Sequence, residues 1–325
     1  MSAPVRFAHG RRRLLVGAAG LAALGGVAAF RASAASRGLA LRTRAGLAFG
    51  TTVALTAAGP DLSAIEAALS DGFAAMRAVE DAASLFRSDS ALARLNRDGV
   101  LEAPDPHLVV LLRFALALAA ETGGAFDPTV QPLWPVWAQA AARGERPGAE
   151  ALRAALARVG WQRVQVGTDR VVLEPGTALT LNALVQGYAA DQVMAALRAR
   201  GIADAFVDTG EFGAAGAHPD GTPWRLGLAD PRHPGAVAAV IAPFTGFAAT
   251  SGDYNMSFSD DRADHHIFDP ATGRSPRALS SVTVTAPTGL AADGLSTACM
   301  VLGRARGAGL VAARPGCAVR FTGKD

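Results

Sequence analysis

Hydrophobic positions along this chain repeat in two spacings, one typical of helices and one typical of strands. Apolar residues three and four apart predict helices, and alternating or short apolar runs predict strands. The predicted helices cover residues 63–79, 90–96, 105–123, 149–159, 187–200 and 291–302. The predicted strands cover residues 47–56, 161–166, 170–174, 178–181, 203–207, 224–228, 237–243, 246–249, 281–286 and 317–321. The strands do not alternate regularly with the helices, so we expect an α+β fold with mixed or antiparallel sheets and packed helices, rather than a doubly wound parallel sheet.

Two of the helix starts carry capping residues. Ser63 and Glu66 have the spacing of a capping box, which satisfies two backbone N–H groups at the beginning of a helix. Asp105 stands directly before Pro106, the residue favoured at the first helical position. We therefore expect helices to begin at both places.

Three polar segments interrupt this apolar pattern. The largest runs from residue 249 to 273 and holds hydroxyls, carboxylates, turn-forming residues and two of the six histidines. Shorter ones lie at 182–188 and 293–297. A core strand does not need such polarity, so we expect folding to bring the three segments together around a ligand.

Residues 1–34 have the three parts of a secretory signal. Arginines at 11–13 precede Leu14-Leu15 and an apolar run over 16–30, and Ala32-Ser33-Ala34 forms a small-x-small cleavage site. The twin arginine and the weakly hydrophobic run favour the twin-arginine route, which implies a periplasmic protein with its main domain at 35–325. The alternative is a membrane anchor, but the run is short and contains glycines, so no stable anchor is expected.

The export signal also accounts for the positive charge of the chain. The formal net charge is +3, and the segment 1–34 contributes five arginines and no acid, which leaves −2 for the rest. A nucleic-acid partner therefore has no electrostatic support. Cys299 and Cys317 are the only cysteines, and the sequence does not decide whether they pair.

Asp293 and Thr297 are four residues apart at the start of an apolar helix, so they share one face. A carboxylate and a hydroxyl on one helical turn suit Mg²⁺, which prefers hard oxygen ligands and often shares them with phosphates. The alternative is an Asp that caps the helix and a Thr bonded to its own backbone. From this segment alone the alternative is favoured.

The other two polar segments allow similar pairs of interpretations. Around Gly187 a predicted strand meets a helix, which would present free N–H groups to an anion, or would be an ordinary connection. His266 and Asp269 flank a turn, where the imidazole could accept a proton near neutral pH or simply hydrogen-bond the turn. Taken singly, each segment favours the structural interpretation.

Taken together and in order, the motifs resemble those of the FAD:protein FMN transferase family, the ApbE-like flavin transferases. The resemblance covers nearly all of the chain after the signal. It is carried by Phe-Gly-Thr at 49–51, Ser-x-Phe-x3-Ser-x4-Leu-Asn at 84–96, Gly-Gly-Ala-Phe-Asp-Pro-Thr at 123–129, Gly-Tyr-Ala-Ala-Asp at 187–191, Thr-Gly-Glu at 209–211, Pro-Trp at 223–224, Thr-Ser-Gly-Asp-Tyr at 250–254, His-His-Ile-x-Asp-Pro-x-Thr-Gly at 265–273 and Ala-Asp-x-Leu-Ser-Thr-Ala at 292–298.

The resemblance implies an ApbE-like fold with a nucleotide site between lobes, and a Mg²⁺-dependent transfer of FMN from FAD to a Ser or Thr hydroxyl of another protein, with release of AMP. Asp293, Thr297 and the backbone carbonyl of Ala183 would hold the metal on the FAD pyrophosphate. His266 would act near the reacting phosphate, and we hypothesise that it activates the incoming hydroxyl. Asp253 is the second residue expected to be catalytic.

The remaining residues implied by the resemblance contact the flavin nucleotide. Phe49 and Phe86 match positions that line or stack on its rings, and Ala125-Phe126-Asp127 match a nucleotide contact. Thr180 stands where the family usually has Asp, Gln186 where it has Lys or Glu, and Phe49 where Met is common. These changes bear on substrate affinity or rate more than on the fold, and we expect an active enzyme.

Two alternative functions use the same pocket: hydrolysis of FAD to FMN and AMP, and flavin binding without catalysis. The expected acceptors are exported or membrane-bound electron-transfer proteins. Export of such a transferase by the twin-arginine route resembles the NosX-type accessory proteins of nitrous oxide respiration. The site residues do not encode which acceptor is served.

Overall fold

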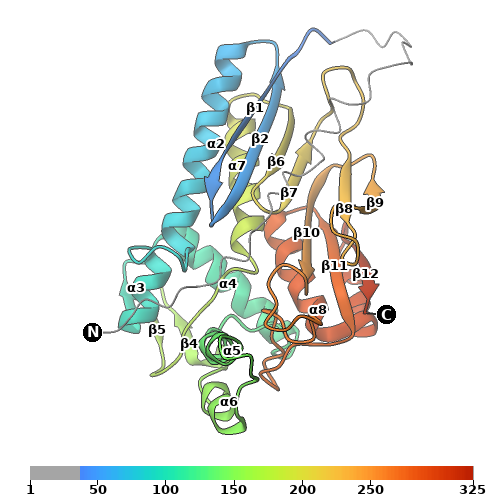
Figure 1. The fold of residues 1–325 in the computed structure, drawn as a ribbon. Helices are drawn as coiled ribbons and strands as arrows, with labels where there is room; N and C mark the ends of the chain where they lie inside the picture. Colours follow the sequence, from blue (N-terminus) through green and yellow to red (C-terminus); the bar gives the residue numbers. More distant parts are fainter. Residues whose placement is uncertain (1–36, 325) are drawn as a thin grey trace.

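The computed structural model describes residues 37–324, and its largest feature is a seven-stranded sheet (Figure 1). The strand order is β1-β2-β6-β7-β10-β11-β12, and each neighbouring pair is antiparallel. These strands are β1 (Ala40–Ala48), β2 (Thr51–Gly59), β6 (Asp204–Asp208), β7 (Phe212–Ala215), β10 (Gly246–Gly252), β11 (Leu279–Ala286) and β12 (Ala318–Gly323). The predicted export signal at 1–34 lies outside the described residues.

Three helices pack against this sheet: α2 (Leu62–Ala83), α7 (Val185–Ala199) and α8 (Gly289–Ala312). α7 lies beside both α2 and α8, and α8 contacts β10 and β11 (Figure 1). Ile65, Leu69, Met76 and Val79 form the buried stripe of α2, at the helical spacing that the sequence shows. This layer encloses most of the hydrophobic core.

A second apolar cluster gathers around Trp224, Phe244 and Phe206, with the short hairpin of β8 (Leu226–Ala229) and β9 (Val237–Ile241). Phe206 lies on β6 and Trp224 just before β8, and their rings are 5.8 Å apart between centroids. The hairpin therefore packs against residues of the large sheet.

Most of the remaining elements lie toward one end of the molecule (Figure 1). They are α3 (Ala91–Asp98), β3 (Val100–Glu102), α4 (Pro106–Glu121), α5 (Leu133–Ala141), α6 (Ala149–Leu156), a 3₁₀ turn (Trp161–Arg163), β4 (Val164–Val166) and β5 (Arg170–Leu173). Strands β3, β5 and β4 form a three-stranded sheet. Helices α5 and α6 share a core with Phe258 and Phe268 from the long connection between β10 and β11. That connection carries the histidine pair.

The predicted α+β class with antiparallel sheets and packed helices is confirmed. The predicted helix start at Asp105-Pro106 is confirmed too, because the Asp105 carboxylate accepts from the His107 N–H at 2.7 Å. The capping box at Ser63 is wrong: Asp61 caps α2 and accepts from the Ser63 N–H at 2.8 Å. None of the helices between residues 37 and 324 is long and apolar enough to cross a membrane.

The prediction of one strand over 47–56 is wrong, because the chain reverses inside it. Phe49 and Gly50 have φ values of 52° and 71° and join β1 to β2 as a two-residue hairpin turn. The Phe49 N–H donates to Glu80 Oε1 on α2 at 2.7 Å, which holds this unusual backbone. A non-glycine residue with positive φ is a weak turn signal, so the alternation of apolar residues dominated the prediction.

The predicted strand at 178–181 and the helix start at Gly187 are also wrong. The N–H and carbonyl of Leu179 bond the side chain of Asn96 rather than a neighbouring strand. Helix α7 begins two residues earlier than predicted, at Val185, so Gly187 lies inside its first turn. Helix α5 was not predicted.

Candidate active site

The N-terminal turns of α7 and α8 touch through two glycines. A Cβ atom on Gly187 would lie 2.2 Å from the Gly289 carbonyl oxygen, and one on Gly289 would lie 2.1 Å from the Gly187 carbonyl oxygen. The Asp191 carboxylate secures this contact, because it accepts from the N–H groups of Gly289 at 2.7 Å and Leu290 at 2.9 Å. Only glycine allows the backbones to come this close.

This contact brings Asp293 of α8 to the start of α7. The Gly187 N–H donates to Asp293 Oδ2 at 3.0 Å. The prediction of a free N–H at Gly187 is therefore wrong, because a carboxylate of the protein already occupies it. Gly187 lies in the first turn of α7, where a backbone N–H has no partner within the helix, so the Asp293 carboxylate satisfies it.

Two buried or partly buried carboxylates meet at this point. Burial raises the pKa of Asp293 above its usual range, and the charge of Asp191 adds to the rise. Glu211, on the turn between β6 and β7, accepts from the Thr250 N–H at 3.0 Å. Burial and then the charge of Asp293 raise the pKa of Glu211 well above its usual range. Both carboxyls therefore keep their protons to higher pH than exposed carboxyls do.

A row of hydroxyls borders these carboxylates. Ser251 Oγ lies 2.8 Å from both Ser296 Oγ and Thr297 Oγ1, and Thr250 Oγ1 lies 2.8 Å from Thr283 Oγ1. These contacts tie β10 to α8 and to β11. They hold the Thr297 hydroxyl one turn beyond Asp293, as the four-residue spacing predicts.

The arrangement offers oxygen ligands of the kind that Mg²⁺ takes. Asp293 supplies a carboxylate and Thr297 a hydroxyl, and Ala183, which precedes the first turn of α7, supplies a backbone carbonyl. Within residues 37–324 no three His, Cys, Asp or Glu side chains converge in a way that could hold a metal. The predicted magnesium ligands are one carboxylate, one hydroxyl and one backbone carbonyl, so they do not form a cluster of three such side chains. A cation beside Asp293 and Glu211 would favour the ionised form of both carboxyls, so the chemistry of this site fits a cation.

The two adjacent histidines have different roles in the structure. His265 is fully buried, its Nε2 lies 3.0 Å from the Pro276 carbonyl, and its Nδ1 accepts from the Ile267 N–H at 3.4 Å. Burial lowers the pKa of His265 to about 4. Both ring nitrogens are therefore used inside the protein, and His265 is a neutral structural residue.

His266 is half-buried and keeps one nitrogen available. Its Nδ1 lies 3.0 Å from the Met256 carbonyl, and a carbonyl only accepts hydrogen bonds, so Nδ1 carries the proton. Burial lowers the pKa of His266, although the Met256 carbonyl and the Asp253 carboxylate favour the protonated ring. At neutral pH the ring therefore presents Nε2 as a proton acceptor.

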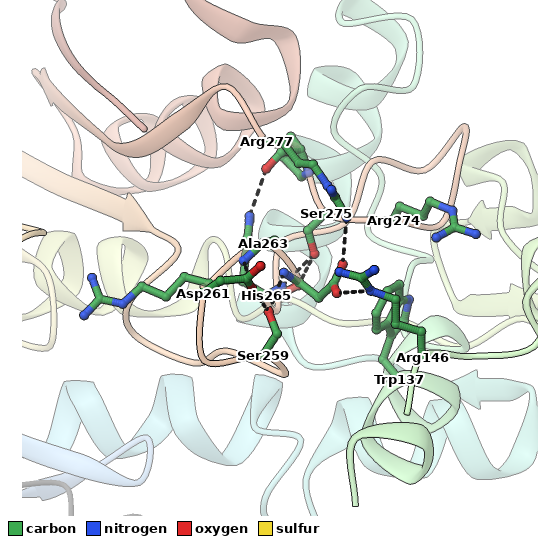
Figure 2. A network of polar contacts seen from close by, with 12 residues as sticks. Trp137, Arg146, Ser259, Asp261, Ala263, His265, Arg274, Ser275 and Arg277 are labelled. Atoms are coloured by element: carbon green, nitrogen blue, oxygen red, sulfur yellow. Dashed lines mark hydrogen bonds and ion pairs between the residues drawn. The ribbon is translucent and has the colours of Figure 1, made fainter. Parts of the chain in front are cut away.

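Figure 2 shows the polar network that fixes this loop around His265. Ser275 Oγ donates to the His265 carbonyl at 2.6 Å and accepts from the His265 N–H at 2.8 Å. The buried Asp264 carboxylate bonds Arg146 at 2.6 Å and Arg277 at 3.4 Å. Trp137 Nε1 of α5 donates to the Gly273 carbonyl at 2.8 Å. Contacts with α5, with Arg146 and within the loop itself thus fix its conformation.

Asp269 belongs to the turn that follows His266. The Asp269 carboxylate accepts from the Ala271 N–H at 2.9 Å and from Thr272 Oγ1 at 3.1 Å, so it forms the local turn. The carboxylate that acts on His266 electrostatically is Asp253.

Asp253 is a buried carboxylate with one unused oxygen. It is 1% exposed, its Oδ2 lies 3.2 Å from Lys324 Nζ, and its Oδ1 has no hydrogen-bond partner among the described residues. Burial raises the pKa of Asp253, while Lys324 acts in the opposite direction. Beside it, burial and the charges of Glu211 and Asp253 raise the pKa of Tyr254 to about 12. Tyr254 therefore lies close enough to Glu211 and Asp253 to be affected by both charges.

The residues expected to contact the nucleotide differ in whether their side chains are free to bind a ligand. The Asp127 carboxylate accepts from the Thr129 N–H at 2.8 Å, Thr129 Oγ1 at 2.6 Å and the Trp161 N–H at 2.9 Å. Phe126 belongs to the core, and Ala125 is partly exposed. This segment can therefore offer its backbone to a ligand more readily than its side chains.

The two phenylalanines differ in the same way. Phe49 is 8% exposed and packs in the core, whereas Phe86 is 73% exposed in the loop after α2. A large aromatic side chain on the surface is a suitable stacking partner for a flat ligand. Phe86 is free for that role, and Phe49 forms part of the hairpin turn.

Thr180 and Gln186 flank the Ala183 loop. The Thr180 N–H donates to the Pro128 carbonyl at 2.8 Å, which places the Ala183 loop beside the 125–129 segment. The Gln186 carbonyl accepts from Thr209 Oγ1 at 2.8 Å, and its side chain packs on Gly210. Folding therefore brings both positions to the segments that surround Asp293.

Two residues in this region were not among the predicted site residues, namely Glu211 and Lys324. Glu211 follows a buried strand in a polar turn, which is a usable sequence signal. Lys324 is the one lysine of the sequence. The two cysteines are both free: Cys299 is buried and Cys317 is half-buried.

Comparison with known proteins gives consistent matches. The model of the ApbE family matches residues 49–321. A protein of Treponema pallidum named FAD:protein FMN transferase is 32% identical over 284 residues, which are 80% of this chain and 78% of that protein. The protein of the same name from Salmonella typhimurium is 35% identical, over 74% of this chain and 73% of its own length. The solved structure of the flavin transferase ApbE from Vibrio cholerae has a TM-score of 0.76 at 28% identity, covering 87% of this chain and 93% of that chain.

Proposed function

The chain belongs to the ApbE family, and on this premise we propose that it is an enzyme that transfers the FMN half of FAD to a hydroxyl group of another protein. Relatives that carry the name FAD:protein FMN transferase support the reaction and the protein acceptor. The observation that carries the proposal is the half-buried His266, whose Nδ1 is fixed on a carbonyl and whose Nε2 remains free.

The acceptor in this proposal is a Ser or Thr hydroxyl. Such a group is neutral and must lose its proton as it attacks, so the reaction needs a base. The hydroxyl oxygen forms a bond to the phosphorus of the FMN half, and the bond between that phosphorus and the bridging pyrophosphate oxygen breaks. The hydroxyl proton moves to Nε2 of His266, and AMP leaves with the bridging oxygen. The Met256 carbonyl holds the ring in the required tautomer throughout.

A Mg²⁺ ion fits the site through Asp293, Thr297 and the Ala183 carbonyl. When bound, it would neutralise charge on the FAD pyrophosphate. Gly187 keeps the Asp293 carboxylate oriented toward α7, and Ser251 keeps the Thr297 hydroxyl in place. Asp293 lies close enough to Glu211 for its charge to raise the pKa of the Glu211 carboxyl.

The metal set is tested with Asp293→Asn, which keeps the shape of the side chain and removes its charge. We expect this variant to lose the rise in melting temperature that Mg²⁺ gives the wild-type protein, since a ligand that binds only the folded state stabilises it. Asp230→Asn, at a carboxylate remote from α8 in the sequence and bonded to Arg232 and His233, is the control. An unchanged Mg²⁺ response in Asp293→Asn would remove Asp293 from the set.

The reaction is tested with residues 35–325, FAD, Mg²⁺ and a purified protein that carries a Ser/Thr flavinylation motif. Flavin fluorescence that survives denaturing electrophoresis, with the mass of FMN added to the acceptor, is the expected result. Release of AMP without an acceptor would instead identify an FAD pyrophosphatase. Tight FAD binding without turnover would identify a binding protein.

We propose further that the enzyme is periplasmic and that its acceptors are exported or membrane-bound electron-transfer proteins. The twin arginine and apolar run in residues 1–34 support the export route. Covalently bound FMN suits a redox protein that works outside the cytoplasm, because it cannot dissociate.

A further inference from the structure

Lys324 directly follows β12 and reaches the same loop that carries His266. Its backbone N–H donates to the Ala278 carbonyl at 3.4 Å, which continues the pairing of β12 with β11. Its ammonium group lies 3.2 Å from Asp253 Oδ2 and also donates to the Arg262 carbonyl. One side chain therefore joins the end of the large sheet to two points of the connection between β10 and β11.

The Arg262 contact stabilises an unusual backbone. Arg262 has a φ of 56°, in the left-handed region that non-glycine residues seldom occupy. Its guanidinium donates to the Pro231 carbonyl, and its own carbonyl accepts from Lys324. The backbone of Arg262 is thus fixed from both sides.

The Asp253 contact satisfies only one of the two carboxylate oxygens. The carboxylate is buried, its Oδ2 faces Lys324, and its Oδ1 has no partner among residues 37–324. A buried carboxylate oxygen without a partner is costly unless a ligand or water completes it. The charged groups that act on Asp253 are Lys324 and Arg262, and His266 and Tyr254 sense its charge.

We propose that Lys324 is a positioning residue for FMN transfer, which holds the Asp253 carboxylate in place at the start of the loop that carries His266. The proton that His266 takes from the incoming hydroxyl makes its ring cationic, and the fixed Asp253 carboxylate stabilises that cation. In this role Lys324 contacts neither the hydroxyl nor the phosphate, and it acts through Asp253 alone. This inference rests on the transfer reaction proposed above.

Removal of the ammonium group should show this role. In Lys324→Met the apolar stem remains, and we expect kcat to fall by about tenfold, the scale typical for loss of a group that orients a reactive residue. The dissociation constant of FAD should stay unchanged, because Lys324 does not touch the nucleotide. Lys324→Arg keeps the charge and should recover most of the rate. Arg320→Met, at an exposed basic residue of β12, is the matched control and should behave as wild type.

The pH profile separates positioning from simple structural support. Without Lys324, Asp253 takes up a proton more easily, so its pKa rises and the ionised form requires higher pH. The acidic limb of kcat should therefore move to higher pH in Lys324→Met and stay in place in Lys324→Arg. A Lys324→Met, Asp253→Asn double variant should be little slower than Asp253→Asn, because both changes act on one interaction.

The outcomes distinguish the two proposals. A wild-type protein that transfers no FMN contradicts the proposed function. A wild-type protein that transfers FMN, together with an unchanged rate in Lys324→Met, contradicts the role of Lys324 only. A loss in Lys324→Met that Lys324→Arg does not recover, or a rate loss without a moved acidic limb, would also overturn it.

Discussion

The adjacent residues His265 and His266 have the same side chain but lie in different surroundings. Both ring nitrogens of His265 contact backbone groups, whereas among residues 37–324 only Nδ1 of His266 has a hydrogen-bond partner. Neighbours in sequence point to opposite sides of an extended segment. One histidine is therefore available for chemistry, and the other holds the loop.

Replacement of His266 tests the assignment of the proton acceptor. His266→Ala should lower kcat by about 10²- to 10⁴-fold, the range of general base catalysis, and change the FAD dissociation constant much less. Single-turnover flavin transfer and FAD fluorescence titration measure the two effects. His233→Ala, at an exposed histidine paired with Asp230, is the control. A defect confined to FAD binding would contradict the role as base.

His265 should make the stability of the protein depend on pH. Its pKa is about 4 in the folded chain and about 6.5 when unfolded, so the unfolded state binds more protons between these values. The stability that His265 contributes is present above pH 6.5 and is lost as pH falls toward 4, by about 3 kcal/mol in all.

The variant His265→Gln keeps hydrogen-bonding groups and cannot become charged. Urea unfolding of wild type and variant at pH 7.5 and pH 5 isolates the contribution, because other titrating groups cancel in the difference. We expect the gap in unfolding free energy between the two proteins to shrink as pH falls. A gap that is the same at both pH values would show that His265 remains neutral when unfolded or is charged when folded.

At the level of elements, the site depends on how closely α7 and α8 approach. Gly187 and Gly289 bring the two backbones into contact, and Asp191 caps α8 from α7. The Asp293 carboxylate can then accept from the Gly187 N–H. The geometry of the metal-ligand candidates is therefore a property of the crossing of two helices, not of either helix alone.

A methyl group at this crossing should separate the helices. Gly187→Ala places a Cβ 2.2 Å from the Gly289 oxygen, a backbone atom that cannot move aside as the end of a flexible side chain could. We expect unfolding free energy to fall by roughly 1–3 kcal/mol or more, as in other overpacked sites, together with loss of the Mg²⁺ response. Thermal melting measures both.

The control for this prediction is Gly309→Ala, at a glycine of α8 where an added Cβ would meet no neighbouring atom within 4 Å. Alanine should be neutral there or stabilise by up to about 1 kcal/mol, since it favours the helix. Equal effects of the two substitutions would show that the crossing is not tightly constrained.

At the scale of the whole molecule, the candidate site lies where separate parts of the chain meet. The large sheet supplies β10, the helical layer supplies the first turns of α7 and α8, and the loop between β10 and β11 supplies the histidines. α5 anchors that loop through Trp137 and shares its core with Phe258 and Phe268. Because the loop is held at several points, the site can keep its geometry in the absence of substrate.

Export is the prediction that concerns the whole molecule. Changing Arg11 and Arg12 to lysine keeps the charge and removes the twin arginine, so we expect the protein to stay in the cytoplasm. Cell fractionation with an antibody against the main domain measures this. The control replaces Arg6 and Arg31, which lie outside the pair, by lysine. Normal export of the Arg11 and Arg12 variant would contradict the twin-arginine route.

Features that depend on residues close together in the chain could be predicted from the sequence alone. The helical stripe of α2, the Asp105-Pro106 helix start and the shared face of Asp293 and Thr297 follow from spacing within a few residues. The ordered motifs also indicated the family, because together they are far more specific than any one of them.

Contacts between residues far apart in the chain could not be predicted from the sequence and became known from the fold. The turn at Phe49 depends on Glu80, the position of Asp293 depends on Gly187, and the state of Asp253 depends on Lys324. Each of these contacts joins residues more than thirty positions apart. Local spacing and propensity contain no information about such contacts, because they arise when packing buries the polar groups and each group must find a partner.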